Sequence, residues 1–306
     1  MEPILSVEEL AVSFSMYDRG LRKADLAVIR SLSLDVRPGE VLGVIGSSGS
    51  GKSLLAHAIM GILPPNATVR GEVLYRGEPL TEARLRGLRG REIAFIPQSV
   101  DYLDPLMRVG RQVVGTFGTR AAQEAIFERY RLGAGVARMY PFQLSGGMAR
   151  RVLFATAAVG GDVKLVVADE PTPGLGPDLA AKMMKHFREF ADAGAGVLLI
   201  THDVDLALGY ADRIAVFYAG ATVEIATAAE FAAGGAALRH PYSRAFSDAL
   251  PQNRFLPIPG SQPYAGSLPE GCPFAARCPE RTEACLAGDV PMRDLRGGKV
   301  RCVHAA

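Results

Sequence analysis

The chain has 306 residues, with 34 Lys and Arg against 32 Asp and Glu and a formal net charge of +2. This near balance gives no electrostatic case for nucleic-acid binding, and no basic block or acidic tail is present. The N-terminal residues lack the pattern of a secretory signal, and no apolar run approaches the roughly 18 residues of a membrane helix. We therefore expect a cytoplasmic chain with one large domain and a smaller appendage.

Alternating apolar and polar residues predict two strands before the first helix, at 6–14 and 30–36, with a turn at 17–20. A third, apolar strand is predicted at 41–45. Three strands before the first long helix differ from a simple βαβ repeat, so we predict an antiparallel strand layer beside a parallel sheet. Further strands are predicted at 93–96, 164–168, 196–200, 214–218 and 221–225, a hairpin from residue 72, and helices at 54–60, 121–131, 152–159 and 178–193.

A complete G-x-x-x-x-G-K-[ST] phosphate loop stands between the apolar strand at 41–45 and the helix at 54–60. Such a loop aims backbone N–H groups and a helix N-terminus at phosphate oxygens, and its glycines permit the close approach. Lys52 would reach the β- and γ-phosphates, and the Ser53 hydroxyl would bind Mg²⁺. The predicted nucleotide-binding residues here are Gly46, Ser47, Ser48, Gly49, Ser50, Gly51, Lys52 and Ser53.

Polar residues also follow three other predicted strands. Asp169 and Glu170 end an unbroken apolar strand, which would deliver both carboxylates to the edge where phosphates and metal bind. Asp169 would hold Mg²⁺ and Glu170 would polarise the attacking water. His202 ends another strand within reach of the γ-phosphate, and Gln98 follows the strand at 93–96.

These motifs, together with the segment Leu144, Ser145, Gly146 and Gly147, resemble the nucleotide-binding subunit of an ATP-binding cassette (ABC) transporter over residues 5 to about 230. The resemblance implies an ATPase that works as a head-to-tail dimer. Each ATP would lie between the phosphate loop of one subunit and residues 145–147 of the other, whose hydroxyl, N–H groups and helix N-terminus suit a γ-phosphate.

The resemblance also implies roles for individual residues. Gln98 would sense Mg²⁺ and the attacking water and couple the ATP state to a membrane partner. His202 would brace the γ-phosphate during hydrolysis. An aromatic side chain near the N-terminus would stack on adenine, and both Phe14 and Tyr17 are candidates.

The C-terminal segment narrows the resemblance. A His240-Pro-Tyr sequence, a Pro-rich linker and a Cys-rich ending resemble the oligopeptide, dipeptide and nickel importer ATPases. This implies an importer with an extracytoplasmic solute-binding protein, two permease subunits and a second, non-identical ATPase. The present chain would then lie at the cytoplasmic face of the bacterial inner membrane. We divide the chain into an ABC domain at 1–232, with a helical subdomain at about 99–160, and a C-terminal region at 233–306.

All four cysteines lie in this region: Cys272, Cys278, Cys285 and Cys302. Disulfides are disfavoured in a reducing cytoplasm, and the C-x5-C-x6-C-x16-C spacing lacks the C-x2-C pairs of most zinc sites. Four thiolates on loops suit an iron–sulfur cluster, which the importer resemblance also favours. We expect a [4Fe–4S] cluster with a structural role, and zinc and free thiols remain alternatives.

The sequence departs from the family pattern in two places. Gly176 stands where an aspartate is expected to cross the dimer interface, and only one clear helix, at 121–131, is predicted between Gln98 and Ser145. Either change is consistent with a subunit that pairs with a non-identical partner.

Two other functions share these motifs. An ABC exporter ATPase is an alternative, which the C-terminal segment disfavours. ABC ATPases of DNA repair or translation carry paired cassettes, coiled coils or zinc inserts, and this nearly neutral single cassette has none.

Overall fold

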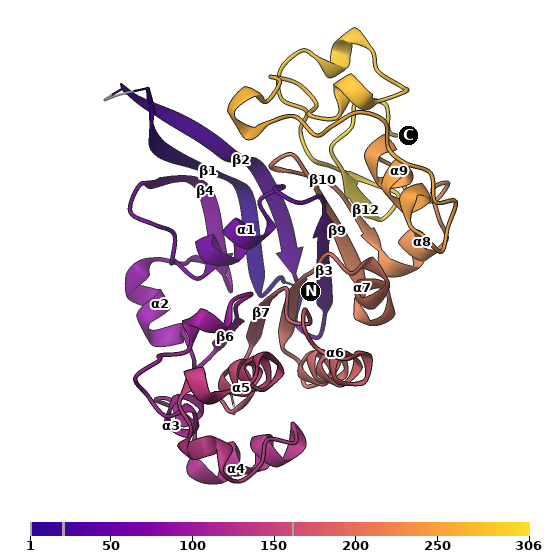
Figure 1. Ribbon diagram of the computed structural model, residues 1–306. Coiled ribbons are helices and arrows are strands. Elements are labelled where there is room, and N and C mark those ends of the chain that lie inside the picture. The colour runs from indigo at the N-terminus through magenta and orange to yellow at the C-terminus, as the bar shows by residue number, and fades with distance from the viewer. Residues whose placement is uncertain (1, 20–21, 161) are drawn as a thin grey trace.

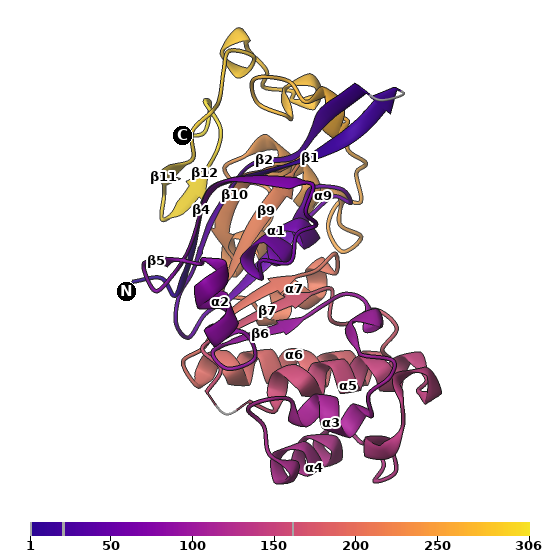
Figure 2. The same cartoon turned by 90° about the vertical axis from the view of Figure 1, so that its left-hand side faces the viewer.

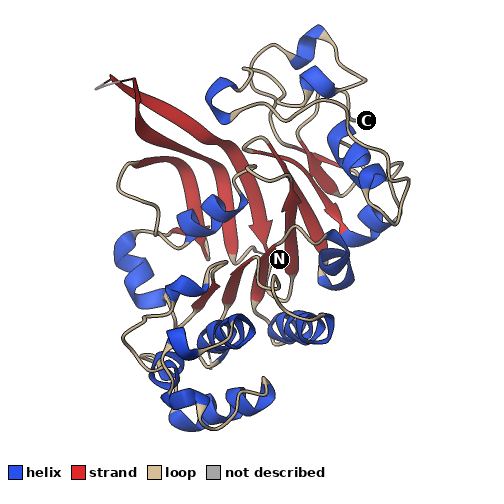
Figure 3. Cartoon of the chain, in the orientation of Figure 1, coloured by secondary structure: helices blue, strands red, loops and turns tan. Residues whose placement is uncertain are grey.

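The computed structural model describes residues 2–19, 22–160 and 162–306, and its strands form one large curled sheet with helices on its faces (Figures 1 and 3). The strand order is β5-β4-β1-β2-β10-β9-β3-β8-β7-β6, and β12 joins the side of β10. The antiparallel part contains β1 (Leu5–Arg19), β2 (Arg22–Val36), β4 (Ala67–Tyr75) and β5 (Glu78–Pro79). The parallel part contains β9 (Arg213–Tyr218), β3 (Val41–Gly46), β8 (Gly196–Ile200), β7 (Leu165–Asp169) and β6 (Ile93–Ile96).

The predicted antiparallel layer beside a parallel sheet is therefore confirmed. β10 (Ala221–Thr227) forms the expected hairpin with β9. The turn predicted at 17–20 is wrong for residues 17–19, because β1 continues to Arg19 and pairs with β2, with an irregularity in the register between Tyr17 and Arg19. Gly20, the last residue of that predicted turn, lies outside the described residues.

Apolar residues fill two layers around the parallel strands, which are buried on both faces as their unbroken apolar sequences require. One layer lies between the strands and α1 (Lys52–Ile59). The other lies beneath the helices α3 (Val109–Val114), α4 (Arg120–Arg129), α5 (Gly146–Ala158) and α6 (Pro177–Asp192). The helices α3–α5 lie at one end of the molecule, opposite the C-terminal segment (Figure 2).

The expectation of a single helix between Gln98 and Ser145 is wrong, because α3 precedes α4. The α3 sequence contains Gly110 and three valines, which are poor helix formers, so its pattern gave no clear helix signal. Packing stabilises it instead: a Cβ at Gly110 would lie 2.7 Å from the carbonyl oxygen of Ala137. Four further helices were not predicted from sequence: α2 (Glu82–Leu88), α7 (Val204–Tyr210), α8 (Ala228–Ala232) and α9 (Pro241–Ala249).

The C-terminal segment packs along β10 and β2, where it adds the short strands β11 (Arg293–Leu295) and β12 (Gly298–Val300). It has little apolar core of its own, and most of its large buried side chains belong to a cluster shared with β9 and α7. Within the described residues, no helix is long and apolar enough to cross a membrane.

Candidate functional site

The phosphate loop turns out of β3 directly into α1, at the carboxyl edge of the parallel strands. Gly46 has φ +153°, and a Cβ there would lie 2.2 Å from the carbonyl oxygen of Phe217. Gly51 has φ +96°, and its Cβ would lie 2.8 Å from Ile29. Both positions thus require glycine, for backbone conformation as well as for space.

Lys52 lies inside this loop. Its ammonium donates hydrogen bonds to the carbonyl oxygens of Gly46 at 2.9 Å and Ser47 at 3.0 Å. Burial lowers the pKa of Lys52, and the nearby carboxylates of Glu170 and Asp169 oppose that shift. The cation and the backbone N–H groups of the loop make a site suited to phosphate.

One cleft brings together several of the predicted residues. Its lining includes five loop residues, Ser48, Gly49, Gly51, Lys52 and Ser53, and two residues from other strand ends, Gln98 and Glu170. Motifs more than a hundred residues apart in sequence therefore meet at one edge of the sheet, which is where ligands bind in open α/β folds.

Asp169 is buried beneath this cleft, with 1% of its surface exposed. Burial raises the pKa of its carboxyl group, the charge of Glu170 adds to the shift, and a hydrogen bond with Ser53 opposes it. Its Oδ1 is buried, and no residue that the structure describes donates a hydrogen bond to it. A buried carboxylate oxygen with a free lone pair, beside a serine hydroxyl, is a donor set that Mg²⁺ accepts, so these residues fit the expected ion.

Glu170 and His202 form a hydrogen-bonded pair, with 2.6 Å between His202 Nδ1 and Glu170 Oε2. The Glu170 side chain is 8% exposed and that of His202 is 69% exposed, so the pair spans from the cleft wall to solvent. Glu170 has φ +46°, an uncommon backbone conformation for a residue with a side chain, and strained residues of this kind gather at functional sites.

Arg150 on α5 connects two strand ends, although sequence reasoning did not identify it. Its guanidinium donates to the carbonyl oxygen of Gln98 and, at 3.5 Å, to that of Glu170. Burial lowers its pKa, and the Glu170 charge opposes that shift. Arg150 had no distinct signal in the sequence, because it stands next to Arg151 and nothing local tells which of the two arginines faces the strand ends.

The residues 145–147 do not line the cleft of their own chain. Ser145 caps α5, where its Oγ accepts from Met148 N at 3.3 Å, and a Cβ at Gly146 or Gly147 would meet no atom within 4 Å. This surface is therefore open at the start of a helix, where backbone N–H groups point outward.

The two candidate adenine-stacking residues have different surroundings. Phe14 is packed against the core, whereas Tyr17 is 64% exposed with Lys23 Nζ 5.8 Å from its ring centroid. Among the described residues that line the cleft, neither side chain is included.

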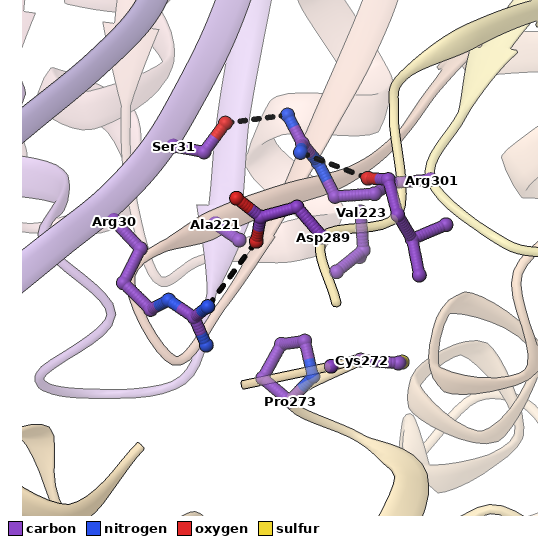
Figure 4. Close-up of a pocket in the computed structure, with 10 residues that line it drawn as sticks. Arg30, Ser31, Ala221, Val223, Cys272, Pro273, Asp289 and Arg301 are labelled. Carbon is purple, nitrogen blue, oxygen red and sulfur yellow. Dashed lines mark hydrogen bonds and ion pairs between the residues drawn. The ribbon is translucent and has the colours of Figure 1, made fainter. Parts of the chain in front are cut away.

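Arginines attach the C-terminal segment to the sheet. Arg301 donates to Glu9 Oε1 at 3.0 Å, Ser31 Oγ at 2.6 Å and the Val290 carbonyl oxygen at 3.0 Å. Arg30 pairs with Asp289 at 3.2 Å. Figure 4 shows Arg301 with Ser31, and Arg30 with Asp289, around a small pocket that Cys272 also lines.

The His240-Pro-Tyr sequence docks on β10 through a buried glutamate. Glu224 accepts from the backbone N–H groups of Arg239 at 2.7 Å and His240 at 2.8 Å, and it pairs with the buried Arg239 guanidinium at 3.3 Å. His240 Nδ1 caps α9 by accepting from Tyr242 N at 3.0 Å. Burial and the charge of Arg244 lower the pKa of His240 to about 3.

All four cysteines are free, and all four line one small cavity with His304. Cys285 Sγ lies 3.3 Å from His304 Nε2. Burial raises the pKa of Cys272 to about 11 and also raises that of Cys278. Within residues 2–19, 22–160 and 162–306, no group of three or more His, Cys, Asp or Glu side chains is arranged to hold a single metal ion.

Comparisons with known proteins agree with this geometry. Residues 29–173 match the ABC transporter family, and residues 223–285 match the C-terminal region of oligopeptide/dipeptide transporters. The fold resembles the dimeric structure of MJ0796, a bacterial ABC transporter cassette, with a TM-score of 0.62 and 23% identity over 73% of this chain and 98% of that one. The chain therefore belongs to the ATP-binding subunits of ABC transporters, to which it also aligns over nearly its whole length, and it is an ATPase that uses ATP with Mg²⁺.

Its relatives narrow the family further. The chain is 34% identical to the oligopeptide transport ATP-binding protein OppD of Escherichia coli, over 98% of this chain and 92% of OppD. It is 33% identical to the dipeptide transport ATP-binding protein DppD of Bacillus subtilis, over 93% of this chain and 89% of DppD. The predicted family and enzyme class are confirmed.

Proposed function

We propose that this ATPase drives the import of peptides. The observation that carries the proposal is the pairing of an ABC cassette with the C-terminal region found in oligopeptide/dipeptide transporters, in one chain aligned almost end to end with peptide transport proteins. The names of these relatives favour peptides over nickel as the cargo. An exporter ATPase would share the cassette but not this C-terminal region.

Residues of the cleft would hold and hydrolyse ATP. The loop backbone and Lys52 would bind the phosphates, and Ser53 and Asp169 would hold Mg²⁺ with the help of Gln98. Mg²⁺ supplies charge neutralisation on the phosphate oxygens when it is bound. Arg150 fixes the chain at Gln98 and Glu170 through their carbonyl oxygens, which orients both side chains towards the cleft.

Glu170 acts as the general base. Its carboxylate accepts a proton from water while the water oxygen bonds to the γ-phosphorus and the bond to the β–γ bridging oxygen breaks, which yields ADP and inorganic phosphate. The His202 Nδ1–H donates a hydrogen bond to Glu170 Oε2 and holds that carboxylate in place beside the γ-phosphate. The strained backbone of Glu170 keeps the side chain aimed into the cleft.

A second ATPase subunit would complete the site. The open N-terminus of α5, with Ser145, Gly146 and Gly147, suits the γ-phosphate of ATP bound to the partner. Gly176 is exposed ahead of α6 and brings no side chain to that interface, which favours a non-identical partner. Phe14 or Tyr17 would stack on adenine.

We further propose that the chain works at the cytoplasmic face of the bacterial inner membrane with two permease subunits, which receive peptide from an extracytoplasmic binding protein. The ABC domain would comprise residues 1–232, with the helical subdomain at about 99–160, and the C-terminal region residues 233–306.

Reconstitution tests the transport function. The chain is co-expressed with two peptide permease subunits and a second ATPase from the same organism, the complex is placed in proteoliposomes, and uptake of a labelled peptide is measured with binding protein and ATP. ATP-dependent uptake that stops in a Glu170→Gln complex supports import. Uptake of nickel but not peptide, or ATP-dependent efflux, would refute the proposal.

We propose that the four cysteines hold a [4Fe–4S] cluster. Four free thiols that converge on one cavity provide the donor set that such a cluster needs, and the cavity wall is otherwise largely apolar. Thiolate ligation would release the thiol protons and cross-link loops that have few apolar contacts of their own. The role is therefore structural.

Anaerobic purification tests the cluster. Iron and acid-labile sulfide should each approach about four per chain, with absorption near that of iron–sulfur proteins, and both should be lost in Cys278→Ser. Cys278 is preferable to the buried Cys285 because it is only half-buried, so its substitution disturbs packing less. Zinc in place of iron, or no metal, would refute the cluster.

A further inference from the structure

The C-terminal segment reaches the phosphate loop directly. The Ser47 hydroxyl donates a hydrogen bond to the side-chain oxygen of Gln262, 215 residues further along the chain. The carbonyl oxygen of Ser47 meanwhile accepts from Lys52 Nζ at 3.0 Å and from Ser50 N at 3.3 Å. Ser47 therefore takes part in hydrogen bonds within the phosphate loop and also in one that connects the loop to the C-terminal segment.

A second C-terminal side chain lies under the same serine. Tyr242 is 2% exposed, and its ring packs on Tyr218 with centroids 4.3 Å apart and on Phe274 at 5.3 Å. Burial raises the pKa of Tyr242 to about 12, and hydrogen bonding to Ser47 opposes that shift. The loop therefore packs on a buried aromatic cluster that includes Phe274. In the sequence, Phe274 lies between Cys272 and Cys278.

Arg277 fixes the segment that carries Gln262. Its guanidinium donates to the carbonyl oxygens of Ile258 at 2.8 Å and Pro259 at 2.6 Å, and to Tyr218 Oη at 3.2 Å. We call residues 258–262 the strap. The strap is held by Arg277 at one end and by Ser47 at the other, and Arg277 immediately precedes Cys278.

We propose that Gln262 is a positioning residue for nucleotide binding, through which the strap holds the phosphate loop in its phosphate-ready shape. The loop contains three glycines with positive φ and would lose much conformational freedom on binding ATP. A loop that is already ordered loses less, so it binds more tightly. This inference rests on nucleotide binding by the family, and it depends neither on the cargo nor on the cluster.

Equilibrium binding of a fluorescent N-methylanthraniloyl ATP with Mg²⁺ to the full chain tests the inference. Gln262→Ala should raise Kd by about three- to tenfold, the usual effect of one lost hydrogen bond. Gln252→Ala is the matched control, since the Gln252 amide donates its hydrogen bond to Asp205 on α7 and not to a residue of the phosphate loop. An unchanged or lower Kd for Gln262→Ala, or an equal rise in the control, would overturn the inference.

A double-mutant cycle separates positioning from a general structural effect. If the two side chains act through their mutual hydrogen bond, the double variant Ser47→Ala/Gln262→Ala should bind nucleotide about as weakly as the weaker-binding single variant.

Steady-state ATPase assays should show a higher KM for ATP with kcat unchanged in Gln262→Ala, the pattern expected when ground state and transition state lose the same binding energy. Additive effects in the cycle, or a fall in kcat alone, would contradict the role. A wild-type chain that binds no nucleotide would refute nucleotide binding itself.

Discussion

The phosphate cleft and the cysteine cavity are both built from residues distant in sequence, but they are held together differently. The cleft lies at the edge of buried parallel strands, whose apolar side chains fix the strand ends that carry Gln98, Asp169 and Glu170. The cysteine cavity lies among loops and short 3₁₀ turns, which are attached to the sheet by arginines and one buried glutamate. A site on strand ends inherits the rigidity of the core, whereas a site on loops needs polar anchors and a cross-link.

The largest expected effect concerns chemistry in the cleft, with no loss of structure. Glu170→Gln should lower kcat for ATP hydrolysis by about 10²- to 10⁴-fold, because the amide keeps the shape of the side chain but is a poor base. Affinity for ATP and the thermal unfolding temperature should change little. Glu128→Gln, on the exposed face of α4, is the control. Wild-type turnover by Glu170→Gln, measured as phosphate release, would remove Glu170 from the mechanism.

The next effect concerns the anchors of the C-terminal segment. Arg239→Met leaves the buried carboxylate of Glu224 without its cation, which should destabilise the docking of this segment by about 3 kcal/mol. Limited proteolysis within residues 250–306 should accelerate about 10²-fold, while the cassette resists cleavage. Arg254→Met removes an arginine whose side chain is 68% exposed, and this variant should be cleaved at the wild-type rate. Equal rates in both variants would show that the Arg239 pair is not an anchor.

The smallest effect is a pH dependence. His240 has its pKa lowered to about 3, against 6.5 for a free histidine, so unfolding takes up a proton between these values. The stability due to its neutral burial is present above pH 6.5 and is lost as the pH falls towards 3. This amounts to about 2 kcal/mol between pH 7 and pH 5.

The variant that tests this dependence is His240→Asn, because asparagine can also cap α9. Urea unfolding at pH 7 and pH 5 should show that the variant loses about 2 kcal/mol less stability than the wild type over this interval. An identical loss in both chains would mean that another group carries the acid sensitivity.

The contrast between the cleft and the cysteine cavity also explains which parts of the fold and the site could be predicted from sequence. The phosphate loop, Asp169–Glu170 and His202 each follow a strand with an unbroken apolar sequence, and the carboxyl ends of parallel strands meet at one edge. Local patterns were therefore enough to predict the mixed sheet and several of the residues that line the cleft. The helix α3 escaped prediction because glycine and valine are stable there only through packing.

The sequence by itself determined the family, the phosphate loop and the position of two carboxylates at the end of a parallel strand. Those signals are short motifs and patterns of apolar residues, and both are local in the sequence. Only the tertiary structure decided that Gln262 binds Ser47, that Arg150 bridges Gln98 and Glu170, and that four scattered cysteines line one cavity. These contacts join loops and helix faces across long stretches of chain. No local preference specifies them, since they exist only after the strands and helices have packed.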